Sequence, residues 1–147
     1  MGKEMAFRGG EGDGDPQFEL DGVPCLQIDV LHVELASRLL AIVSQLEAGI
    51  GWWRPEAPLE PYHDGIFRVR RLSELPLGVI EAIDVGVTSE GNVSELRVRV
   101  DGQELFLISG EAVERTDGTL FFQRDDESLL VFRSRDDINR LAWAGAD

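Results

Sequence analysis

The sequence predicts an α+β fold, in which a long N-terminal helix packs on an antiparallel β-meander of about five to six strands and a short C-terminal helix ends the chain. Two observations carry this prediction. Apolar residues recur at helical spacing over residues 30–48, and Asp-Gly pairs separate segments of alternating apolar and polar residues further along the chain. A capping pattern at Ser134 adds the short C-terminal helix.

Length and composition predict a single folded domain. The chain has 147 residues, of which 43% are hydrophobic and 29% are charged, as in soluble globular proteins. Residues 1–16 are rich in glycine and aspartate and lack periodicity, so a flexible tail is expected there, followed by one α+β domain over residues 17–147. The single cysteine, Cys25, lies among apolar residues, which favours a buried structural thiol.

The long helix is expected over residues 30–48, VLHVELASRLLAIVSQLEA. Asp29 is placed as its N-cap and Gly49 as its C-terminal stop. One apolar stripe runs along the segment, formed by Leu31, Leu35, Leu39, Ile42 and Leu46. This stripe would pack on one face of the sheet.

Two hairpins are expected at Asp-Gly turns. In the first, Asp101-Gly102 forms a two-residue turn, so that Val98 faces Leu105 and Arg99 faces Glu104. In the second, residues 111–124 fold about Asp117-Gly118, with Val113 opposite Phe122 and Glu111 opposite Arg124.

Further strands are expected at residues 66–70, 79–87 and 129–132, where apolar residues alternate with polar ones or form a short run. The short C-terminal helix is expected over residues 135–143, with Ser134 as its cap and Asp137 three positions on.

Residues 51–65, GWWRPEAPLEPYHDG, connect the expected helix to the sheet. Three prolines spaced three apart favour an extended path, and Asp64-Gly65 would then turn the chain. The first interpretation has Trp52 and Trp53 anchoring this connector on the core. The alternative is an exposed interface that also uses Arg54 and Tyr62, because tryptophan and arginine are favoured interface anchors.

The sequence offers little catalytic chemistry. No nucleophile motif, phosphate-binding loop or set of zinc ligands is found, so no catalytic residue, metal or cofactor is predicted and the chain is expected not to be an enzyme. His63-Asp64 is the one local acid–base pair, and a turn alone explains it. No apolar run reaches membrane-spanning length and no signal-like segment is present, so a cytoplasmic location without membrane contact is expected.

Charge indicates the class of partner. Twenty-eight acidic residues against fourteen basic ones give a net charge of −14, which opposes binding to nucleic acid. A basic protein partner would instead be attracted. The residues expected to meet it form two acidic clusters, Asp125, Asp126 and Glu127 in the first and Asp136 and Asp137 in the second.

In size, charge and the strands around 120-LFFQRDDESLLVF-132, the chain resembles the small acidic immunity proteins of bacterial polymorphic toxin systems. That resemblance implies an inhibitor that binds a basic toxin domain and neutralises it. The chain also resembles the acidic dimeric chaperones of type III effectors, which hold an unfolded segment of their partner. A third class is an enzyme or small-ligand binder, with a pocket lined by Trp52, Trp53, Tyr62 and His63. A monomer that forms one tight complex would favour the inhibitor and a dimer the chaperone, so the oligomeric state is left open.

Overall fold

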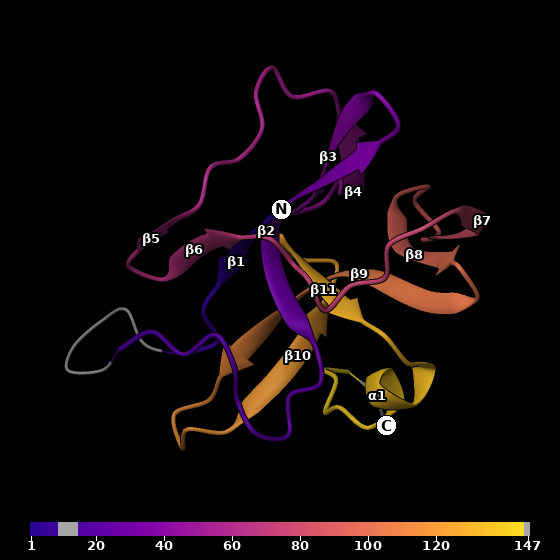
Figure 1. The fold of residues 1–147 in the computed structure, drawn as a ribbon. Helices are drawn as coiled ribbons and strands as arrows, with labels where there is room; N and C mark the ends of the chain where they lie inside the picture. Colours follow the sequence, from indigo (N-terminus) through magenta and orange to yellow (C-terminus); the bar gives the residue numbers. More distant parts are fainter. Residues whose placement is uncertain (9–14, 146–147) are drawn as a thin grey trace.

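A computed structural model describes residues 1–8 and 15–145, and its fold is almost entirely β. Strands take 54% of the described residues and helix 4%, so the α+β prediction is wrong. Figure 1 labels the elements in chain order. They are β1 (Gly2–Met5), β2 (Leu26–Leu35), β3 (Arg38–Gln45), β4 (Gly49–Trp53), β5 (Tyr62–Asp64), β6 (Phe67–Arg70), β7 (Ile80–Val87), β8 (Val93–Val100), β9 (Gln103–Glu114), β10 (Leu120–Arg124), β11 (Ser128–Phe132) and α1 (Arg135–Asn139).

Six of the strands close into a barrel. Hydrogen-bonded pairing runs from β2 to β3, β4, β8, β9 and β11 and returns to β2. All of these pairs are antiparallel except that of β4 with β8, which is parallel and contains one residue pair, Gly49 with Val93. The expected purely antiparallel meander is therefore corrected as well.

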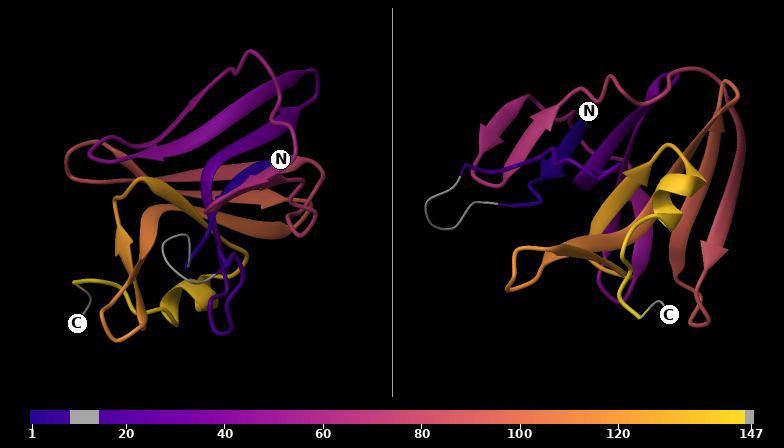
Figure 2. Two further views of the ribbon diagram at one scale, coloured as in Figure 1. Left: turned by 90° about the vertical axis from the view of Figure 1, so that its left-hand side faces the viewer. Right: turned by 90° about the horizontal axis from the view of Figure 1, so that it is seen from below.

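The remaining strands extend the barrel sheet outward. β1 pairs with β2 and β6, and β5 pairs with β6, which makes one wing. β7 pairs with β8, and β10 pairs with β9. The left view of Figure 2 shows the β3–β4 hairpin above the other strands, with α1 at the lower end of the molecule.

Two hydrophobic clusters fill the molecule. The larger lies in the barrel and contains Ile28, Leu31, Ile42, Ile50, Leu72, Leu96, Leu105, Leu107, Leu129 and Val131. The second contains Phe7, Cys25, Phe106, Ile108, Phe122, Leu130, Phe132 and Ile138. Alternate residues of β9 and β11 supply both clusters, because successive side chains of a strand point to opposite faces of the sheet.

The segment expected to be the long helix forms β2 and β3 instead. A register shift where β2 pairs with β1 places both Ile28 and Leu31 in the barrel core, three residues apart. That spacing imitates one turn of a helix. The two strands meet at Ala36-Ser37, where Ala36 takes φ 52°, so the turn lacks the glycine or asparagine that would mark it in the sequence.

The first Asp-Gly hairpin is confirmed and the second is shifted. Asp101 and Gly102 take φ 48° and 77°, and Val98 faces Leu105 as expected. In the second hairpin Val113 faces Phe121, not Phe122, and Gln123, not Arg124, faces Glu111. Arg115 pairs its backbone with Thr119 across a longer loop, which moves the register by one residue.

Both ends of the described chain differ from expectation. Residues 2–5, assigned to a flexible tail, form β1 between β2 and β6, and residues 9–14 of that tail lie outside the described residues. The C-terminal helix is shorter than expected and covers only Arg135–Asn139. Its predicted cap is confirmed, since the Ser134 side chain accepts a hydrogen bond from the Asp136 N–H. Within residues 1–8 and 15–145, no helix has the length and apolar character needed to cross a membrane.

Candidate protein-binding surface

Trp52 and Trp53 lie on β4, one of the barrel strands, and remain exposed. Trp52 pairs with Ile42 and Trp53 with Ala41, so the backbone of both tryptophans is fixed in the sheet. As neighbours on a strand, the two tryptophans direct their side chains to opposite faces of β4. Their exposed fractions are 57% and 46%. The expectation that they anchor a connector on the core is therefore not met, and the arrangement favours the interface interpretation.

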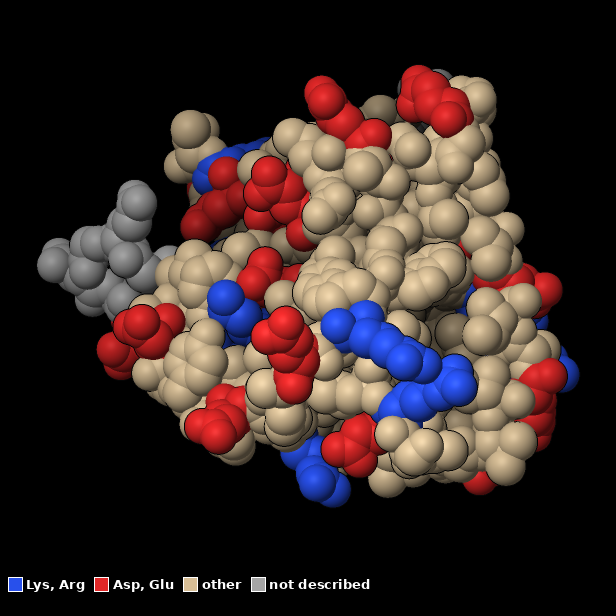
Figure 3. All heavy atoms as spheres, turned by 90° about the horizontal axis from the view of Figure 1, so that it is seen from above, with Lys and Arg blue, Asp and Glu red and all other residues tan. Residues whose placement is uncertain are grey.

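The proline-rich segment connects two strands, not a helix and a sheet. It runs from Trp53 at the end of β4 to Tyr62 at the start of β5, with Arg54 and Tyr62 both exposed. The expected turn at Asp64-Gly65 is present, with Gly65 at φ 57°. Figure 3 views this end of the molecule and shows an area without charge, bordered near the centre of the view by basic side chains and further out by acidic ones.

The first predicted acidic cluster occupies the turn between β10 and β11. Asp125 takes φ 60°, and Glu127 donates its N–H to Asp126 Oδ1 at 2.7 Å. The Asp126 carbonyl accepts hydrogen bonds from the hydroxyls of Ser44 and Ser109 at 2.6 and 3.2 Å. These two buried serines therefore fix the acidic turn to β3 and β9.

Glu111 joins this turn and was missed by sequence reasoning. Burial, followed by the nearby charge of Asp126 and then a hydrogen bond to Asp126, raises the pKa of Glu111 to about 7, with a further contribution from Glu127. The expected pairing of Glu111 with Arg124 concealed this site. Arg124 instead lies 4.6 Å from the Trp143 ring centroid.

The second predicted acidic cluster lies at the other end of β11. Asp136 and Asp137 sit in the first turn of α1, where carboxylates favour the positive end of the helix dipole, and Asp137 pairs with Arg140. The five residues of β11 lie between the two clusters and span ~17 Å. Asp136 and Asp137 therefore do not form one acidic surface with Asp125, Asp126 and Glu127.

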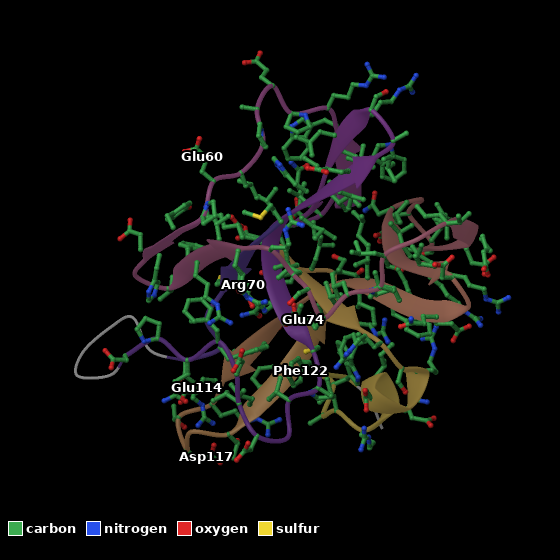
Figure 4. All side chains as sticks on the ribbon, viewed as in Figure 1. Glu60, Arg70, Glu74, Glu114, Asp117 and Phe122 are labelled. Atoms are coloured by element: carbon green, nitrogen blue, oxygen red, sulfur yellow. The ribbon has the colours of Figure 1, made fainter. Side chains whose placement is uncertain are left out.

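A buried ionic group lies around Glu4, away from both acidic clusters, and has a structural explanation. Glu4 is only 2% exposed and accepts hydrogen bonds from Arg68 and Arg70, with Nε–Oε2 distances of 2.7 and 2.8 Å. Arg70 also pairs with Glu74, and Figure 4 shows these two side chains next to each other. These contacts raise the pKa of Arg70 and lower that of Glu74. Arg68 and Arg70 of the basic run thus join β6 to β1 through Glu4, whereas Arg71 is exposed.

Cys25 and the two histidines lie in different surroundings. Burial raises the pKa of the Cys25 thiol to about 12, which keeps it protonated and unreactive. His32 is buried on β2, whereas His63 is exposed on β5 with its ring 5.7 Å from that of Phe18. Among the described residues, no three His, Cys, Asp or Glu side chains are arranged to hold a metal ion.

Comparison of the chain with protein-family models, curated proteins and solved structures finds no match.

Proposed function

We propose that this chain is a non-enzymatic protein-binding domain that neutralises a basic partner, in the manner of a toxin-specific immunity protein. The observation that carries the proposal is the exposed pair Trp52 and Trp53 on a barrel strand of a chain with net charge −14. The proposed site of action is the cytoplasm, where a toxin would have to be neutralised.

The physical basis is an anchor on a rigid support. Large aromatic side chains supply most of the energy of many interfaces, and those on paired strands lose little backbone freedom on binding. Ile42 and Ala41 hold the backbone of both tryptophans by strand pairing. The exposed Arg54 and Tyr62 flank the same segment and extend the contact.

Charge is proposed to act mainly on the rate of encounter. A strongly acidic protein attracts a cationic partner over a distance set by the salt concentration. The turn of Asp125, Asp126 and Glu127 is held by Ser44 and Ser109, so its charges keep a fixed place. We therefore expect association with the basic partner to slow as salt is added.

A second candidate, the secretion chaperone, is favoured by one observation. β7 exposes Ile83, Val85 and Val87, each at 50% or more, and such a strand could hold an extended apolar segment. An inhibitor would bind a folded toxin domain, whereas a chaperone would bind a short unfolded peptide of its partner. Binding of a folded domain and of its isolated peptides therefore separates the two functions.

The function is tested by co-expressing the chain with the protein encoded by the neighbouring gene and measuring growth. Protection by the wild-type chain and loss of protection with Trp52→Ala and Trp53→Ala together would support the proposal. Leu77→Ala, which removes an even more exposed apolar side chain from another segment, is the control and should still protect. The proposal fails if the neighbouring protein is neither toxic nor bound.

A further inference from the structure

β7 is an exposed edge strand with an apolar face. One of its edges pairs with β8, and none of the described strands pairs with the other. The exposed fractions of Ile83, Val85 and Val87 are 55%, 50% and 57%. A long edge of this kind presents both free backbone groups and apolar side chains to any complementary strand.

The free backbone groups of β7 belong to alternate residues. Thr88 donates its N–H to the Asn92 carbonyl across the following turn, so its backbone faces β8. Alternate residues of a strand direct their backbone groups to the same side, so those of Val87, Val85 and Ile83 face away from β8. The pairing of β7 with β8 is irregular at two places, where Glu81 is the extra residue in β7 and Ser94 the extra residue in β8. Because the second extra residue belongs to β8, the alternation within β7 continues from Ala82 to Val87.

We propose that β7 pairs antiparallel with β7 of a second copy of this chain, about a two-fold axis at Val85. This register places Val85 opposite Val85 of the second copy and Ile83 opposite its Val87. All of these residues have outward-facing backbone groups, so each pair exchanges both of its hydrogen bonds. An isologous interface requires a self-complementary surface, and this strand provides one.

Side-chain pairing supports the same register. Val85, Ile83 and Val87 form a continuous apolar strip across the two copies, while Asp84 lies opposite Gly86, which has no side chain. A register centred on Asp84 would place two carboxylates face to face. One centred on Ile83 would place Val85 opposite Glu81, where the strand is irregular. The register at Val85 is therefore the one that combines apolar contacts with separated charges.

Dimerisation through β7 has a distinct salt dependence. Each copy carries a net charge of −14, so the two copies repel one another and added salt strengthens their association. Binding of a basic partner has the opposite dependence. The dimer also covers the apolar strip of β7 and leaves Trp52 and Trp53, which lie on β4, for another protein. A dimer formed in this way therefore does not by itself favour the chaperone function.

The proposal is tested by sedimentation velocity over a range of concentrations. The wild type should dimerise reversibly, and Val85→Lys, which places two ammonium groups opposite each other, should weaken the dimer at least about tenfold. Leu77→Lys makes the same change of charge at an apolar residue that is 87% exposed and outside the paired span, and should dimerise as the wild type does. Circular dichroism of each variant checks the fold. A monomeric wild type, or equal effects of the two lysine substitutions, would overturn the proposal.

The register is tested by cross-linking. Val85→Cys should form a disulfide between two copies under mild oxidation, because residues directly opposite in a hydrogen-bonded pair have Cα atoms ~5.5 Å apart. Ile83→Cys alone should not, since it faces Val87 of the second copy, but it should cross-link to Val87→Cys when the two variants are mixed. Cys25 is buried and contributes little background. Efficient self-cross-linking of Ile83→Cys with none at Val85→Cys would exclude this register.

Discussion

The pKa of Glu111 is raised for a partly buried carboxylate, and the position of the residue explains why. It pairs with Gln123 on β10 and lies beside Asp126 and Glu127 in the next turn. Protonation therefore removes repulsion within the cluster and allows a hydrogen bond to Asp126. The raised pKa of about 7 means that the folded protein binds this proton more tightly than the unfolded chain does.

The sign of this pH dependence is fixed by the raised pKa. The stabilising contribution of protonated Glu111 is fully present below pH 4.5 and is lost as pH rises through about 7. Wild-type stability should therefore lose about 1–2 kcal/mol over this range through Glu111, once solvent screening at a partly buried site is allowed for.

Glu111→Gln keeps the shape and the hydrogen-bond donor, so it should lack this loss and be more stable than wild type at pH 8. Urea unfolding at pH 5 and pH 8 measures the difference between the two proteins. Glu90→Gln removes an exposed charge elsewhere and is the matched control. Identical pH profiles for wild type and Glu111→Gln would refute this assignment.

At the scale of elements, the ionic contacts of Glu4 join β1 to β6. The carboxylate is buried and receives both guanidinium groups, so Glu4→Gln should lower the free energy of unfolding by about 2–3 kcal/mol. Lys3 on the same strand forms a partly exposed pair with Asp29 at 3.1 Å, and Lys3→Gln should cost no more than about 1 kcal/mol. Thermal and urea unfolding of the two variants measure the contrast, and equal losses would contradict it.

The elements also show what the sequence could predict. Asp101 and Gly102 are residue types that accept positive φ, so the sequence predicts the turn, the hairpin and the register of its two strands. Ala36 and Glu47 take φ 52° and 68° although neither residue type favours positive φ. The residue types at these two positions therefore do not predict the turns on either side of β3. The bulge brings Ile28 and Leu31 to one face, so apolar residues three apart in a strand show the spacing expected of a helix. Tertiary pairing, not local preference, decides these strands.

For the candidate site, the sequence predicted which residues could take part but not how they are arranged. Trp52 and Trp53 were singled out by their size, and their exposure follows from a strand that the sequence did not reveal. Asp136 and Asp137 were correctly expected at the start of a helix, but the separation of the two acidic clusters depends on the length and direction of β11. Glu111 could not be found because its neighbours are set by a register that differs by one residue from the expected one.

For the whole molecule, closure of the barrel depends on one close approach. Gly49 takes φ 78°, and a Cβ there would lie 2.4 Å from the Val93 carbonyl oxygen at the single pair that joins β4 to β8. Gly49→Ala should therefore destabilise the fold by about 2–4 kcal/mol, through both strain and separation of the strands. Gly51→Ala, in the same strand with open space around its Cβ, should change stability by less than about 1 kcal/mol. Denaturant unfolding of both variants measures the difference, and a stable Gly49→Ala variant would show that this junction does not hold the barrel.

We propose that the exposed tryptophans of β4, held by strand pairing in an acidic barrel, bind a basic protein. The most direct measurement is the dissociation constant of the purified neighbouring-gene protein with the wild-type chain and with the Trp52→Ala, Trp53→Ala double variant, by isothermal titration calorimetry. We predict tight binding by the wild type and at least about a hundredfold loss for the double variant, with its circular dichroism unchanged. Equal affinity for the two proteins would contradict the claim.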